Sequence, residues 1–84
     1  MATYRLLARI AEIEPGEHCV TVSAVPTDMR SAEVRSDNCK SLDEAEARRD
    51  FLIISLATEI RARGGEILGV TEWGGCQAVG RLPE

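Results

Sequence analysis

The chain has 84 residues, of which 44% are hydrophobic and 29% are charged, a balance that is typical of one small globular domain and argues against a disordered chain. Its net charge of −4 disfavours non-specific binding to phosphate backbones, which requires clustered lysine and arginine. Three widely spaced cysteines, no signal peptide and no apolar run near about 18 residues favour a cytoplasmic protein without a membrane segment.

Residues 3–13 alternate between two faces and predict a strand, with Tyr4 and the next three even-numbered residues on one side. Residues 14–17 follow, and their Pro15-Gly16 pair occupies the two central positions of a type II turn. Residues 18–25 are rich in β-branched side chains and predict a second strand. Together these segments predict a β-hairpin. A third strand, short and edge-like, is predicted at residues 32–36.

A helix is predicted over residues 42–63, and it is the element with the clearest start and stop signals. Ser41 and Glu44 form an S-x-x-E capping box at its start, and Gly64-Gly65 provides the left-handed stop after its last turn. A final strand is predicted over residues 66–73. The segment 74–84 has few anchoring side chains, so we expect one domain over residues 1–84 with a core over about residues 3–73 and a loosely ordered tail.

The order β-β-β-α-β predicts an α+β fold with a four-stranded mixed sheet. If the first three strands form a meander, a right-handed crossover through the helix places the fourth strand beside the first, giving the spatial order 3-2-1-4. One helix covers one face of this sheet only. The other face is left for water or a partner.

The helix positions divide into two faces at 100° per residue. Phe51 and Ile54, with Ala47 between them in angle, fall on the side away from the sheet, where they predict a contact surface for a second copy or another protein. Two scattered exposed apolar residues, or a helix end under the tail, are the alternatives. We expect a homodimer through this face. The expected core-facing row consists of Leu42, Ala45, Leu52, Ile53, Leu56, Ala57 and Ile60.

The sequence gives little support for a catalytic or metal-binding site. His18, the only histidine, neighbours Cys19, but adjacent strand residues point to opposite faces. Cys39 or Cys76 can still approach His18, which leaves open a small enzyme or ligand-binding subunit that uses His18 with a cysteine. Acidic residues in the first helical turns lack a histidine or third ligand at matching spacing, so we expect no metal and no cofactor.

Arginines give the only basis for a nucleic-acid interface. Arg5 and Arg9 share one side of the first strand, and we expect Arg35 to join them across the sheet as a patch for nucleic acid or a partner. No aromatic residue is expected on that face, and the remainder of the domain is acidic. Direct nucleic-acid binding is therefore disfavoured.

The residues 40–45, KSLDEA, match the Ser/Thr-Leu-acidic-acidic-Ala helix start of the HicB-like antitoxin domain, and residues 20–26 are similar to that family's strand running into a proline. From residue 4 to about residue 70 the chain resembles this family, whose fold is a truncated RNase H-like β-β-β-α-β. Two family features differ: Thr27 rather than glycine follows Pro26, and Glu17-His18 stands where a Gly-aromatic pair usually opens the second strand.

The resemblance implies a non-enzymatic domain that neutralises a small basic RNA-cleaving toxin by covering it. An inhibitor of another nucleic-acid-acting protein is a close variant, since a compact acidic domain can occupy a basic nucleic-acid site. The expected partner is therefore another protein.

Overall fold

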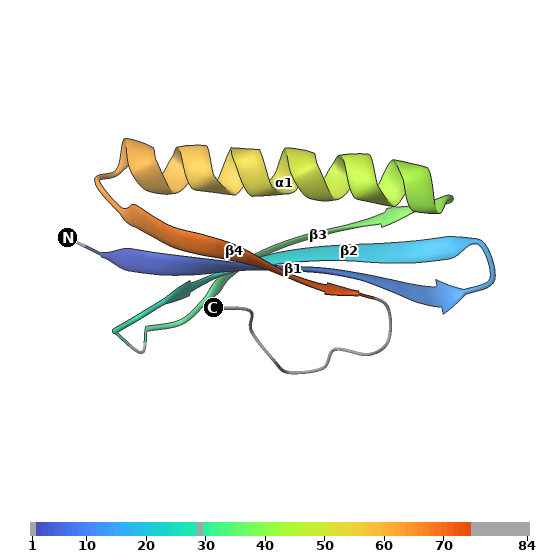
Figure 1. Ribbon diagram of the computed structural model, residues 1–84, viewed down its shortest axis with the longest axis horizontal. Helices are drawn as coiled ribbons and strands as arrows, with labels where there is room; N and C mark the ends of the chain where they lie inside the picture. The colour runs from blue at the N-terminus through green and yellow to red at the C-terminus, as the bar shows by residue number, and fades with distance from the viewer. Residues whose placement is uncertain (1, 29, 75–84) are drawn as a thin grey trace.

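The computed structural model describes residues 2–28 and 30–74 and forms two layers, a four-stranded sheet and one helix on one of its faces (Figure 1). The strand order in the sheet is β3-β2-β1-β4. The predicted α+β class, strand order and single helix are confirmed. The predicted loose tail lies outside the described residues apart from Gly74. In chain order the elements are β1 (Thr3–Glu14), β2 (Glu17–Pro26), β3 (Glu33–Cys39), α1 (Leu42–Ala62) and β4 (Glu66–Gly74).

β1 and β2 form the predicted antiparallel hairpin. Gly16 has a φ of +80°, the left-handed conformation that a type II turn requires at its third position. The pairing places Ile10 opposite Val20, and both side chains are buried under the helix. The alternation read from the sequence therefore corresponds to one sheet face that is covered by α1 and one that is not.

β4 pairs in parallel with β1, as the crossover predicts. The register shifts between Tyr4, which pairs with Ile67, and Arg5, which pairs with Gly69. Leu68 has no partner in this ladder and its side chain is 56% exposed. Beyond this bulge the pairing continues without a further shift, from Arg5 opposite Gly69 to Ile10 opposite Gly74.

The predicted cap and glycine stop are present at the two ends of α1, but the Glu44 carboxylate accepts from Lys40 rather than from Ser41. The Glu44 N–H donates to the Ser41 hydroxyl at 3.1 Å, while the Glu44 carboxylate accepts from the N–H of Lys40 at 3.0 Å. At the other end, Gly64 has a φ of +87°, and the Gly65 N–H donates to the Ile60 carbonyl at 2.9 Å. These bonds satisfy backbone groups that the helix itself leaves free.

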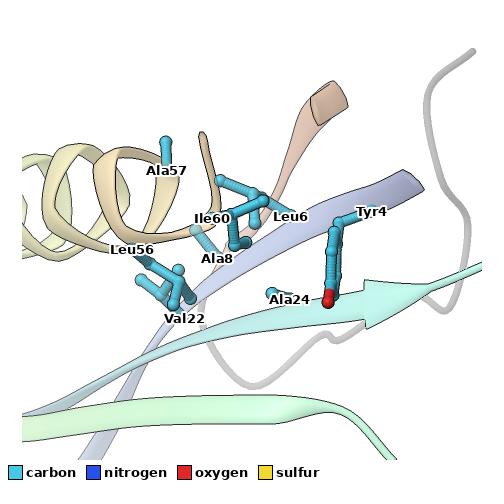
Figure 2. Packing of buried hydrophobic residues seen from close by; sticks show 8 residues of the cluster. All are labelled: Tyr4, Leu6, Ala8, Val22, Ala24, Leu56, Ala57 and Ile60. Atoms are coloured by element: carbon cyan, nitrogen blue, oxygen red, sulfur yellow. The ribbon is translucent and has the colours of Figure 1, made fainter. Parts of the chain in front are cut away.

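The core lies between α1 and the covered sheet face. Figure 2 shows Leu56 against Val22 and Ile60 close to Leu6, within one cluster of buried side chains. A second, smaller cluster contains Cys39 and lies near the start of the helix. The members of the two clusters are Tyr4, Leu6, Ala8, Val22, Ala24, Leu56, Ala57 and Ile60 in the first, and Ile10, Val20, Cys39 and Ala45 in the second.

The prediction that Leu42 belongs to the core is wrong. Leu42 is 50% exposed, whereas Ala45, one turn later, is fully buried. The helix meets the core only from Ala45 onward, so the first helical position does not reach the sheet even though its angle points that way. Leu52 and Ile53 are partly buried against the core, as expected.

Candidate functional site

The outward face of α1 carries two large exposed apolar side chains, Phe51 at 58% and Ile54 at 66% exposure. Ala47 is exposed beside them. The guanidinium of Arg48 lies 5.8 Å from the centroid of the Phe51 ring, and its Nε lies 3.3 Å from the carboxylate of Asp37 on β3. The predicted exposure of this surface is confirmed, while its role in binding stays a prediction.

A shallow depression opens on the same face of α1. It is lined by Glu44, Ala47, Arg48 and Phe51, which follow one another at intervals of three, one and three residues along the helix. Two of the predicted contact residues therefore border a hollow rather than a flat surface.

The predicted arginine patch divides between the two faces of the sheet. Arg35 pairs in register with Val22, whose side chain is buried under α1, and its guanidinium lies 2.9 Å from the carboxylate of Glu59 on the helix. Arg5 and Arg9 alternate with the buried residues of β1 and so lie on the uncovered face. The expectation that Arg35 joins Arg5 and Arg9 is therefore wrong.

The charged side chains of β3 are all paired with α1 or its C-terminal cap. Glu33 accepts a hydrogen bond from Arg63, Arg35 is paired with Glu59, and Asp37 with Arg48. Because these pairs are partly exposed, each contributes only about 0–1 kcal/mol. Their larger effect is on orientation: they hold the charges of an edge strand toward the helix and leave Val34, 53% exposed, on the other face.

Charge is distributed unevenly along the molecule. The β1–β2 hairpin and the start of α1 lie at one end, on the right of Figure 1, while the end of α1 and the start of β4 lie at the other. Exposed carboxylates predominate at the first end, whereas the second end carries arginines and carboxylates together. The residues concerned are Glu12, Glu14, Asp43, Glu46 and Asp50 at the first end, and Arg30, Arg61 and Arg63 with Asp28, Glu59 and Glu66 at the second.

His18 and Cys39 are brought together by the register of β2 and β3, in which they form a directly opposed pair. Cys39 is 1% exposed, and burial raises the pKa of its thiol, an effect to which the carboxylates of Glu44 and Asp37 add. The thiolate is therefore disfavoured, which makes Cys39 a poor nucleophile. The Nδ1 atom of His18 is buried and has no hydrogen-bond partner among the described residues.

The other two cysteines do not complete such a site in the described part of the chain. Cys19 lies on the opposite face of β2 from His18, with its sulfur 3.9 Å from the Thr21 hydroxyl, as the alternation predicts. Cys76 lies outside the described residues. Within residues 2–28 and 30–74, no group of three or more histidine, cysteine, aspartate or glutamate side chains could hold a metal ion.

The buried thiol predicts a pH dependence of stability. In the unfolded chain Cys39 ionises near its ordinary pKa of 9.0, whereas the folded chain retains the proton. The unfolded state therefore loses its proton first, and the free energy of unfolding should fall as the pH rises through this value. We expect a steeper fall in the wild type than in Cys39→Ala, measured by urea denaturation between neutral and alkaline pH. Parallel profiles for the two proteins would contradict this assignment.

Comparison of the chain with protein-family models, with curated proteins and with solved structures gives no match. The resemblance to the HicB-like antitoxin domain therefore stays a prediction. The helix in the described ranges, α1, does not have the length and apolar character needed to cross a bilayer.

Proposed function

We propose that this chain is a small protein-interaction domain that binds another protein and has no catalytic activity of its own. The observation that carries the proposal is the edge position of β3, which has β2 as its one strand neighbour among the described residues. An edge strand presents a row of backbone donors and acceptors to which an extended segment of a partner can add.

The side chains of β3 support this use of its edge. Charges on an edge strand usually oppose strand addition, but those of Glu33 and Arg35 are already neutralised by Arg63 and Glu59. A docking strand would not need to desolvate an unpaired charge there. Val34, 53% exposed on the uncovered face, offers an apolar contact to the added segment.

The charge of the domain supports a basic partner. A net charge of −4, concentrated at the hairpin and the helix start, is complementary to a surface that binds phosphates. The specific form of the proposal is an antitoxin-like inhibitor, similar to the HicB-like domain, which acts in the cytoplasm on a nucleic-acid-acting protein such as a small basic ribonuclease. The chain self-associates while it does so.

The test is a binding measurement with matched variants on the two edges of the sheet. Proteins captured on the immobilised chain from a host lysate are identified, purified and titrated against it by calorimetry. We expect a basic protein that binds with one-to-one stoichiometry and loses affinity as salt rises. Val34→Lys on β3 should weaken binding by about tenfold or more, because edge lysines block strand addition.

The control on the other edge is Val70→Lys, since Val70 is 47% exposed on β4, on the sheet face that α1 covers. It should bind as the wild type does. Equal effects of the two substitutions, or an acidic partner, would overturn the assignment of β3. A metal ion or small molecule that raises the melting temperature of the wild type but not of His18→Ala would instead favour the alternative, a small enzyme or ligand-binding subunit built on His18.

A further inference from the structure

The outward side of α1 carries a row of exposed residues that spans almost the whole helix. Successive members are separated by three, four, three, four and three residues, which is the spacing of the a and d positions of a coiled-coil heptad. Every member is exposed, whereas the sheet-facing residues Leu56 and Ile60 are fully buried. We call this set the outer heptad row; it consists of Glu44, Ala47, Phe51, Ile54, Thr58 and Arg61.

We propose that two copies of this chain form a symmetric antiparallel dimer through the outer heptad row of α1. With the two-fold axis midway between Phe51 and Ile54, Phe51 of each copy lies opposite Ile54 of the other. The same axis places Ala47 opposite Thr58, and Glu44 opposite Arg61. One register thus matches the large apolar residues at the centre, the small residues beside them and opposite charges at both ends.

The charges at the ends of the row select the antiparallel orientation. A parallel pair would place Glu44 against Glu44 and Arg61 against Arg61, and like charges in contact are unfavourable. Arg61 has no ion-pair partner among the described residues, and Glu44 uses one carboxylate oxygen for the N–H of Lys40. The antiparallel arrangement also opposes the two helix dipoles.

The depression on α1 fits this register. Its four lining residues, Glu44, Ala47, Arg48 and Phe51, occupy positions i, i+3, i+4 and i+7, which is the set that forms a hole in knobs-into-holes packing. In the proposed dimer Thr58 of the second copy lies opposite Ala47 and enters this hole. Arg48, held over the Phe51 ring and paired with Asp37, forms one wall of the hole before any partner arrives.

The dimer is independent of the proposed binding through β3. The members of the outer heptad row are exposed, opposite the buried sheet-facing residues of α1, so the proposed helix–helix contact does not use the edge of β3. The two contacts are tested separately: Val34→Lys changes the edge of β3 and tests partner binding, whereas substitutions in the row test the dimer.

The first test is the molecular mass in solution by sedimentation equilibrium. At high micromolar concentration the wild type should have twice the 9.2 kDa mass of the chain. Phe51→Asp should raise the dissociation constant by about 100-fold or more, because central aromatic residues dominate such contacts. The matched control Val34→Asp changes an apolar residue of similar exposure outside the row and should leave the mass unchanged. Circular dichroism checks that both variants are folded.

The second test determines the orientation by disulfide cross-linking. In a Cys19→Ser, Cys76→Ser background, Ala47→Cys and Thr58→Cys proteins are oxidised separately and as a mixture; Cys39 is retained because it is buried. A disulfide requires Cα atoms within about 7 Å, whereas the two copies of residue 47 in the antiparallel register lie about 16 Å apart along the axis. We therefore expect a cross-link in the mixture and none in either protein alone.

The remaining outcomes overturn the proposal. A cross-link in the Ala47→Cys protein alone would show a parallel pair. A wild-type mass of 9.2 kDa at high micromolar concentration would show that the row is not a self-association surface. A dimer that is unaffected by Phe51→Asp would place the contact elsewhere.

Discussion

Replacing Leu56 with alanine is expected to lower the free energy of unfolding by about 2–5 kcal/mol. Leu56 is 0% exposed and packs between the helix and the sheet, close to Val22 (Figure 2). The substitution removes buried methyl groups and leaves a cavity that the surrounding strands close only partly. Small domains have about 5 kcal/mol of stability at the lower end of their range, so we expect the variant to be partly unfolded at 25 °C.

The matched control for Leu56→Ala is Leu42→Ala, the same substitution in the same helix at a position that is 50% exposed. It should cost less than about 1 kcal/mol, because much of its apolar surface is already in water. Urea denaturation of both variants at one low protein concentration gives the comparison without a contribution from self-association. Equal losses in the two variants would show that the helix packs on the sheet in another rotational phase.

Replacing Gly65 with alanine is expected to cost about 1–3 kcal/mol, as overpacked sites generally do. A Cβ atom at this position would lie 2.6 Å from Cγ2 of Ile60, 3.1 Å from its carbonyl oxygen and 3.2 Å from Cε1 of Tyr4. Ile60 and Tyr4 both belong to the main core, so neither side chain can move without loss of packing. Thermal and urea unfolding measure the effect.

Gly64 provides the control for Gly65, because its constraint has a different physical origin. Its φ of +87° disfavours most side chains, yet no atom lies within 4 Å of a Cβ built there. Asparagine tolerates the left-handed region, so Gly64→Asn should cost less than Gly64→Ala. Gly65→Asn should cost at least as much as Gly65→Ala. Rescue by asparagine at residue 65 would contradict the steric explanation.

The architecture could be predicted from sequence because its determinants are local. The Ser41–Glu44 cap and Gly64 fix the two ends of the helix, and Pro15-Gly16 fixes the hairpin turn. Once these elements are placed, the handedness of the crossover leaves few arrangements of the sheet. The exposure of Phe51 and Ile54 follows equally from the angular periodicity of one long helix.

The features that could not be predicted depend on registers between segments distant in the sequence. The sequence predicts the third strand at residues 32–36, whereas β3 spans Glu33–Cys39. Residues 36–38 are polar and show no alternation of apolar and polar side chains, so the sequence does not reveal that they pair with β2. A shift of one residue reverses the faces of a strand, so the sequence could not show that Arg35 lies under α1 or that His18 faces Cys39. The close approach of Gly65 to Ile60 and Tyr4 likewise exists only in the packed chain.

The central position of β1 in the sheet affects how the chain folds during its synthesis on the ribosome. β1 and β2 can pair as soon as residue 26 has emerged, but the second neighbour of β1 is complete only at residue 74. At about 5–20 residues per second, synthesis of the intervening segment takes about 2–10 s. Until α1 is complete at residue 62, the nascent hairpin exposes both its apolar face and the free edge of β1; after that the edge alone stays unpaired. Pairing of β4 with β1 therefore covers the remaining free edge of β1, at which the nascent chain could aggregate or bind chaperones.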